Sequence, residues 1–410
     1  MHYDINISLR DLYKICTFLC NRTKNIDSKI KEKLTNFIVC IILALSLIII
    51  CNLSVSLVFG NNYQNIESTR GSFDLRSGNI IRQPTINSAL SILNTDCPGE
   101  LAIYIHGVWA TNEMVEEQTQ RVYLSLKKEG YQIPLIGFSW DSNTTFSLDD
   151  INLSKHGWDI AKKIANKNGP LLAKFILDYK KECPNDNLRI IAHSLGSRVI
   201  LSAMQSLHDN EIMNDNQSAI WNKKIKSIHL LGAAVNAEQI SLNQADCIHN
   251  VPPLRCSGVP IESESEHFYN LYDPEDNMLG PEHVIIPSCP FCLCPFCYDI
   301  VIKSPYQISE MHNALGANKK DSAISEPSNY REHNVLSKIK SEADSNKDSK
   351  CDLLVNLKNF GYPFNYNFCT ITKSGDNHFG YMGYRSSINP QTVSSSGAIE
   401  TVVTDWKNDS

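Results

Sequence analysis

Long blocks of basic residues are what this sequence most plainly lacks. The net charge is −6 at pH 7, and no long run of Lys and Arg occurs beyond the N-terminal region. Proteins that bind nucleic acid neutralise phosphates with clustered positive charge. The sequence therefore gives no support to a nucleic-acid partner.

Charge is also missing from one long apolar segment, Phe37 to Phe59, which has 23 residues. As a helix it spans roughly 34 Å at about 1.5 Å per residue, enough for the hydrocarbon core of a bilayer. Residues 1–36 carry seven basic and four acidic side chains, a net of 7 − 4 = +3 that favours a cytoplasmic N-terminus. We therefore expect a cytoplasmic segment at 1–36, a transmembrane helix or signal anchor at 37–59, and a cell-membrane protein whose remaining residues lie outside the cytoplasm.

A cleaved signal peptide is the alternative to a permanent anchor. Small residues at Ser54, Ser56 and Gly60 could form a cleavage site, and the product would be secreted. The segment before the apolar run is long for a signal peptide, which favours the anchor.

Beyond the membrane segment, the hydropathy pattern divides the chain into three parts. Residues 60–96 are polar and read as a linker, with a short helical phase near Ile86 to Leu93. Residues 97–385 alternate strand and helix patterns, which predicts an α/β fold with a mainly parallel sheet and helices on both faces. Residues 386–410 read as a polar C-terminal tail.

The expected elements of the central part follow from periodicity. Strands are expected at Leu101–Ile105, Ile133–Phe138, Leu188–Ala192, Ile225–Leu231 and Phe268–Tyr272. Helices are expected at Asn112–Lys128, Gly157–Glu182 and Ser197–His208, with a further one at Ala237–Ala245. Right-handed crossovers bring the ends of successive parallel strands to one edge of the sheet, where catalytic groups collect.

The stretch "RIIAHSLGSRVI" places Ser194 between the end of a buried strand and the start of a helix. A chain that turns so sharply needs small residues beside the turn, and Ala192 and Gly196 provide them. The pattern resembles the nucleophile elbow G-x-S-x-G of the α/β-hydrolase superfamily, with alanine at the first glycine. By this resemblance Ser194 is the nucleophile of a serine esterase or lipase.

The string "YIHGVWA" ends the first expected strand, and its His-Gly pair resembles the oxyanion loop of the same superfamily. The resemblance implies that the backbone N–H groups of Val108 and Leu195 stabilise the developing oxyanion. It also implies the chain order serine, acid, histidine. His378, in "SGDNHFGYMGY", is the only histidine after His333 and is the expected base.

The acid is expected just after the strand "HFYNLY", where the chain continues "DPEDNML". Asp276 fits the superfamily pattern better, because an apolar residue, Met278, follows it closely. Asp273 precedes a proline and reads as a turn former, but it remains the alternative acid. The 102 residues between Asp276 and His378 are more than a compact hydrolase needs, so we expect a Cys-rich and polar insertion at about 281–350.

Ten cysteines lie beyond the apolar segment, an even number that suggests disulfides in an oxidising compartment. Cys247 and Cys256 are expected to pair across a short loop. The spacing C-x2-C-x-C-x2-C at Cys289 to Cys297 could also bind zinc, but one residue between the two knuckles leaves little chain for a tetrahedral site, so disulfides are favoured and no metal is expected.

Together these patterns predict a membrane-anchored serine hydrolase that acts on a small-molecule or lipid ester through Ser194, His378 and Asp276 and needs no cofactor. Two alternatives stay open. One is a non-catalytic binding module on a hydrolase scaffold, and the other is an acyltransferase that uses the same triad.

Overall fold

The computed structural model describes only part of the chain. The described residues are 65–145, 151–213, 224–247, 255–276, 278–279, 283–285, 300–302, 314–317, 324–343, 354–356, 367–369, 377–386, 389 and 391–409. The chain divides into two compact units, Met1–Asn62 and Tyr63–Ser410, and all described residues belong to the second. No helix within the described residues has the length and hydropathy to cross a bilayer. The apolar segment 37–59 lies outside them, so its membrane role stays a prediction.

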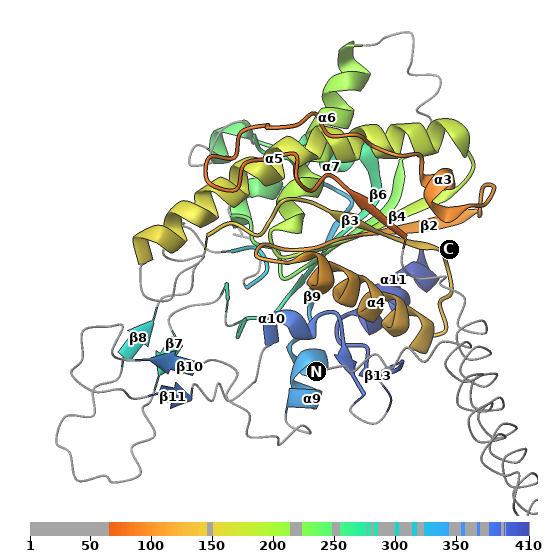
Figure 1. The fold of residues 1–410 in the computed structure, drawn as a ribbon. Coiled ribbons are helices and arrows are strands. Elements are labelled where there is room, and N and C mark those ends of the chain that lie inside the picture. The colour runs from red at the N-terminus through yellow and green to blue at the C-terminus, as the bar shows by residue number, and fades with distance from the viewer. Residues whose placement is uncertain are drawn as a thin grey trace, which may run out of the picture. The chain divides into compact units, whose positions relative to one another are not determined.

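A seven-stranded sheet forms the centre of the second unit (Figure 1), and all its neighbouring strands are parallel. The strand order is β1 (Asn65–Ser68), β3 (Leu135–Ser139), β2 (Glu100–Ile105), β4 (Asn187–His193), β5 (Ile225–Leu231), β6 (Ser265–Tyr272) and β9 (Tyr330–Asn334). The predicted α/β architecture is confirmed for this unit.

Helices cover both faces of the sheet (Figure 1). One face packs against α3 (Ala89–Leu93), α5 (Ile151–Glu182), α6 (Gly196–Met213) and α7 (Gly258–Glu264), and the other against α4 (Asn112–Lys128) and α11 (Ile399–Asn408). Ile103 and Ile190 point into the first core, whereas their chain neighbours Tyr104 and Ile191 point into the second. The central strands are therefore apolar on both faces, as buried parallel strands must be.

Helix α4 begins and ends at the residues expected from the sequence. Its N-cap is Thr111, whose hydroxyl accepts a hydrogen bond from the backbone N–H of Met114 at 3.3 Å. Lys127 and Lys128 lie in the last turn, where positive charge is favourable beside the partly negative helix end.

The structure differs from the sequence expectation at both ends of the domain. The expected linker 60–96 contains β1, which pairs with β3 at one edge of the sheet. The expected polar tail 386–410 contains α11, whose Trp406 is fully buried against the second face. The expected helix 237–245 is instead two short 3₁₀ helices, because Ser241 between them takes an extended backbone with ψ 142°.

The region of the expected insertion contributes to the main sheet. β9 pairs with β6 at the opposite edge, and α9 (Leu336–Ala343) follows directly. Three smaller helices are also described: η1 (Ala237–Ile240), η2 (Gln244–Cys247) and α10 (Asn377–Gly380). The remaining strands form three antiparallel pairs: β7 (His283–Ile285) with β8 (Ile300–Ile302), β10 (Leu354–Asn356) with β11 (Asn367–Cys369), and β12 (Tyr384–Arg385) with β13 (Val393–Ser395).

The cysteines at 289–297 lie outside the described residues, so the choice between disulfides and zinc there stays a prediction.

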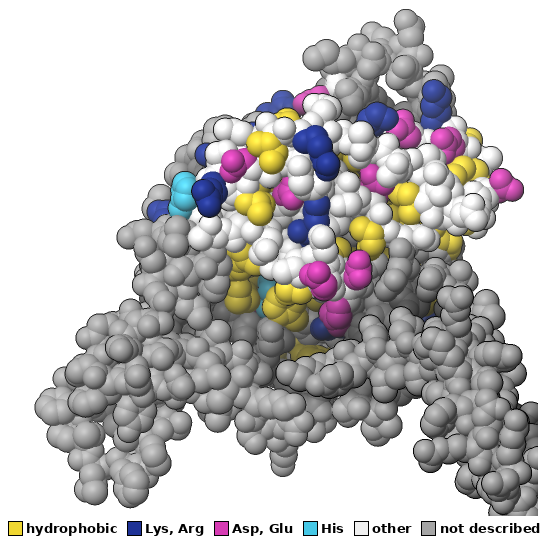
Figure 2. All heavy atoms as spheres, in the orientation of Figure 1, with side chains coloured by type: hydrophobic (Ala, Val, Ile, Leu, Met, Phe, Trp, Pro, Cys, Tyr) yellow, Lys and Arg dark blue, Asp and Glu magenta, His cyan; other side chains and the backbone are white. Residues whose placement is uncertain are grey.

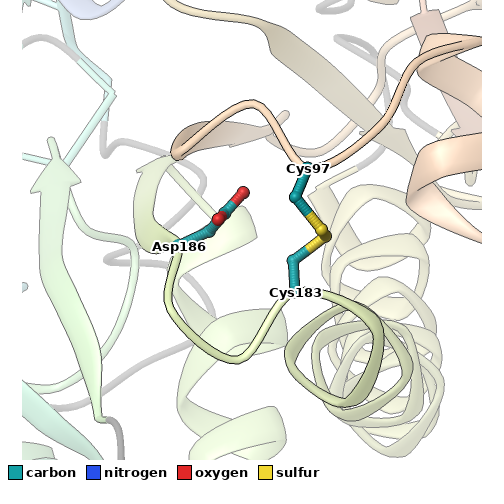
Figure 3. A group of neighbouring side chains, drawn as sticks. All are labelled: Cys97, Cys183 and Asp186. Atoms are coloured by element: carbon teal, nitrogen blue, oxygen red, sulfur yellow. A yellow bond between two sulfur atoms is a disulfide. The ribbon is translucent and has the colours of Figure 1, made fainter.

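Two disulfides occur among the described residues. Cys247 pairs with Cys256, as the sequence predicted, and Cys97 pairs with Cys183. Asp186 lies beside the Cys97–Cys183 bridge (Figure 3). Its carboxylate accepts hydrogen bonds from the Gly99 N–H at 2.9 Å and the Tyr179 hydroxyl at 2.8 Å. The disulfide joins the start of β2 to the end of α5. Both sulfurs are already bonded to each other, so we interpret this group of side chains as structural.

Removing the Cys97–Cys183 bridge should destabilise the domain more than removing Cys247–Cys256. The two bridges close loops of 86 and 9 residues. In the chain-entropy model, that difference in loop length is worth about 2 kcal/mol. We expect the paired substitution Cys97→Ser and Cys183→Ser to lower the free energy of unfolding by about 3–4 kcal/mol, measured by urea unfolding. An equal or larger loss from the paired Cys247→Ser and Cys256→Ser control would contradict this.

The surface over α5 and its neighbours carries charges of both signs. In this view, Lys and Arg side chains stand among Asp and Glu side chains, with apolar side chains scattered between them (Figure 2). Charges mixed in this way do not produce a strong field of one sign over this face.

Candidate active site

Ser194 lies on the sharp turn between β4 and α6, with its backbone in the left-handed region at φ 53°. A non-glycine residue pays a conformational cost there, so neighbouring structure must hold it. The Ser194 N–H donates to the Leu231 carbonyl at 3.0 Å, and the Ser194 carbonyl accepts from the Ala234 N–H at 3.1 Å. The end of β5 therefore fixes the strained turn.

Close packing explains the small residues around this turn. A Cβ on Gly196 would lie 2.6 Å from the Ile105 carbonyl oxygen, and a Cβ on Gly107 would lie 2.8 Å from the Ser194 Cβ. Neither position has space for a side chain. The loop after β2 thus lies directly against the loop after β4.

The order of the strands explains why these two loops meet. The chain moves from β2 outward to β3 and then returns to place β4 on the other side of β2. In open α/β sheets, ligands bind outside the carboxyl ends of the strands at such a reversal. Gly107 follows β2 and Ser194 follows β4, so both lie at this position.

Asp276 and His378 form a buried pair, although they lie 102 residues apart in the chain. The His378 Nδ1 and the Asp276 Oδ2 are 2.8 Å apart, and both side chains are almost fully buried. The other oxygen, Oδ1, accepts backbone N–H groups from Met278 at 2.9 Å and Leu279 at 3.1 Å. A carboxylate held this way keeps the proton on Nδ1 and leaves Nε2 able to accept one.

The alternative acid, Asp273, has a different environment. Its backbone N–H donates to the Gly316 carbonyl at 3.0 Å, and its carboxylate accepts the Glu275 N–H at 2.9 Å. These contacts are those of a turn-forming aspartate directly after β6.

His193 links the base to the nucleophile turn. Its Nε2–H donates to the backbone carbonyl of His378 at 2.8 Å, and the two rings have centroids 4.7 Å apart. Burial, together with the neighbouring His378, lowers the pKa of His193 well below its usual value, so the ring is neutral. His378 is thereby held beside the residue that precedes Ser194.

The hydroxyl of Ser194 itself makes no hydrogen bond to another described residue, His378 included. Catalytic hydrogen bonds are often long in the absence of substrate and tighten in the complex. No described residue accepts the backbone N–H of Val108 or of Leu195 either. The structure thus brings Asp276 to His378 and His378 to the Ser194 turn, with two backbone donors at the neighbouring positions.

A family model described as "Alpha/beta hydrolase of unknown function (DUF900)" matches residues 85–283. The match spans 199 of the 410 residues, just under half of the chain. With the parallel sheet and the strand–turn–helix at Ser194, the domain resembles the α/β-hydrolases. The match covers Ser194 and Asp276 and ends before His378, so it gives no information about the base.

Solved structures that match include two of acetyl xylan esterases. The catalytic core domain of acetyl xylan esterase from Trichoderma reesei is 11% identical, with 35% of this chain and 68% of that chain covered and a TM-score of 0.22. An iodinated complex of acetyl xylan esterase is 10% identical, with 44% and 85% covered and a TM-score of 0.20. No curated protein matches this chain.

Buried neutral histidines should make the stability of this domain fall in acid. Burial, with Arg70 nearby, lowers the pKa of His106 to about 3. In the unfolded chain His106 takes up a proton below about pH 6.5, whereas in the folded chain it stays neutral until about pH 3, so stability falls as pH falls through this window.

One such histidine can change the free energy of unfolding by up to about 1.4 kcal/mol per pH unit. We expect the free energy of unfolding between pH 6 and pH 5 to fall less steeply in His106→Phe than in the wild type, by about this amount. Urea unfolding at the two pH values measures both slopes. Identical slopes would show that His106 takes up its proton as readily in the folded protein as in the unfolded chain, which would contradict this prediction.

Proposed function

We propose that this α/β-hydrolase cleaves carboxylic esters through a Ser194–His378–Asp276 triad. The observation that carries the proposal is the buried 2.8 Å contact of His378 with Asp276 beside the strained turn of Ser194. A carboxylate that orients a buried imidazole next to a serine at the carboxyl edge of the sheet is the arrangement that activates a weak hydroxyl nucleophile.

The reaction proceeds in two halves. The Ser194 hydroxyl attacks the ester carbonyl while the His378 Nε2 takes its proton, and the N–H groups of Val108 and Leu195 stabilise the resulting oxyanion. His378 then gives the proton to the leaving alcohol, and the acyl group stays on Ser194 as the acyl-enzyme. Water, deprotonated by His378, releases the acid and restores the serine. No cofactor takes part in these steps.

The same proposal includes a location. The apolar segment 37–59 anchors the protein in the cell membrane, and the hydrolase domain lies outside the cytoplasm, where it meets a small-molecule or lipid ester. The Cys97–Cys183 and Cys247–Cys256 disulfides support an oxidising compartment. The positive segment 1–36 supports the orientation.

Turnover of chromogenic esters tests the proposal. A series of p-nitrophenyl esters from acetate to palmitate should be hydrolysed by the full chain, and the profile across the series should reveal the acyl preference. The p-nitroanilide of the best acyl group is the matched amide control, and we expect it to be cleaved far more slowly. Absence of turnover across the whole series by correctly folded protein would refute the proposed ester hydrolysis.

A further inference from the structure

His106 is completely buried at the end of β2 and makes hydrogen bonds with both ring nitrogens. Its Nε2 lies 3.1 Å from the backbone nitrogen of Trp140, and its Nδ1 lies 2.7 Å from the carbonyl oxygen of Gly107. The indole of Trp140 stacks on the imidazole and donates its Nε1–H to the His106 carbonyl at 3.0 Å. The ring therefore has one fixed position.

These partners fix the tautomer as well. A backbone N–H can only donate, so the Nε2 facing Trp140 must be the unprotonated nitrogen. The Arg70 guanidinium, 3.5 Å from the same Nε2, is also a donor. The single ring proton then sits on Nδ1 and is donated to the Gly107 carbonyl.

The Gly107 carbonyl belongs to the same peptide unit as the Val108 N–H. That unit is planar and trans, so its C=O and N–H point in opposite directions, and holding one group aims the other. The unit lies against the nucleophile, because a Cβ on Gly107 would be 3.3 Å from the Ser194 hydroxyl oxygen. Glycine is the residue that most easily lets such a peptide rotate.

We infer that His106 is a positioning residue that holds the Gly107–Val108 peptide with its N–H directed at the oxyanion formed on Ser194. The inference rests on the proposed function of Ser194. Without the Nδ1–H contact the peptide can rotate, which replaces a donor with a carbonyl oxygen at the place where negative charge develops. Loss of one oxyanion donor typically costs about 10²- to 10³-fold in kcat.

Arg70, which follows β1, supports the same loop from the other side. Its Nη2 donates to the Ala110 carbonyl at 2.8 Å and its Nε donates to the Ser139 hydroxyl at 2.6 Å. The carboxylate of Asp141 accepts the N–H groups of Gly71, Ser72 and Phe73 and so fixes the segment that carries Arg70. The segment after the edge strand β1 thus contacts the loop after β2 through one side chain, Arg70.

Three substitutions separate positioning from packing. In His106→Asn the amide N–H replaces the Nδ1–H, so the contact with the Gly107 carbonyl is kept. In His106→Gln the amide lies further out, near the Nε2 position, and His106→Phe keeps only the shape of the ring. His229→Phe, at a buried histidine on β5, is the control for the structural cost of such a change.

We expect kcat to fall about 10²- to 10³-fold in His106→Phe and His106→Gln, with KM changed by less than about threefold, and to recover largely in His106→Asn. A thionoester, in which sulfur replaces the carbonyl oxygen, gains less from oxyanion donors. The preference for the oxygen ester over the thionoester should therefore shrink in His106→Phe and remain in His106→Asn and His229→Phe.

Crystal structures of His106→Phe and His106→Asn provide a readout that does not depend on activity. We expect the Gly107 carbonyl to rotate in His106→Phe and to keep its direction in His106→Asn. An unchanged peptide with unchanged kcat in His106→Phe would overturn the positioning role, as would equal losses in all three variants with an unchanged thionoester preference. Failure of the proposed function is distinct, because then Ser194→Ala would leave wild-type turnover intact.

Discussion

Ser194→Ala is expected to lower kcat for ester hydrolysis by at least about 10⁴-fold, because it removes the atom that forms the acyl-enzyme. What remains is the contribution of substrate binding and the backbone donors. The thermal transition should change little, because serine and alanine pay a similar conformational cost at φ 53° and the hydroxyl has no hydrogen-bond partner among the described residues.

Ser197→Ala is the matched control for this substitution. Ser197 lies in the first turn of α6, is fully buried, and its hydroxyl likewise makes no hydrogen bond in the described part of the protein. We expect it to keep kcat within about threefold. Comparable losses in Ser194→Ala and Ser197→Ala, measured with the same ester, would remove the special role of Ser194.

Asp276→Asn is expected to lower kcat by about 10⁴-fold, through the tautomer of His378. The Met278 and Leu279 N–H groups hold Oδ1, so an asparagine would place its oxygen there and direct its NH₂ at the His378 Nδ1. The imidazole would then carry its proton on Nε2, where it cannot accept one from Ser194.

Asp273→Asn is the control for the acid, because an asparagine oxygen can still accept the Glu275 N–H. We expect less than about a tenfold loss of kcat. The reverse ranking of Asp276→Asn and Asp273→Asn in steady-state kinetics would move the acid to Asp273.

The central strands could be predicted because they are buried on both faces and read as continuous apolar runs. The edge strands could not. β1, "NIES", has one apolar residue, and β9, "YREHN", has only Tyr330. Each pairs on one side only, so backbone hydrogen bonding to β3 or β6 decides its conformation, and that information is not in the segment itself.

The sequence of helix α11 has the pattern of an amphipathic helix, but the polar residues before it hide this pattern. Ile399, Val402, Val403 and Trp406 follow the i, i+3, i+4, i+7 spacing of an amphipathic helix. The polar residues of 386–398 dominate the composition of the whole segment, so an average over it reads as a tail. A window of the length of a single helix would have separated the two.

The candidate site shows a similar division. Ser194 stands out locally, because a hydroxyl between small residues at a strand–helix turn is a short-range pattern. Asp276 and His378 follow from chain order by family resemblance. The contacts of His106 and His193 depend on which loops the sheet brings together, so no spacing in the sequence indicates them.

Covalent labelling by an organophosphonate serine probe tests the central claim most directly, because it reports activation of the nucleophile without requiring the natural ester. We predict one adduct per chain, located by mass spectrometry on Ser194, with labelling abolished in Ser194→Ala and strongly slowed in Asp276→Asn. An adduct on another residue, or no adduct on wild-type protein that shows its normal unfolding transition, would contradict the triad.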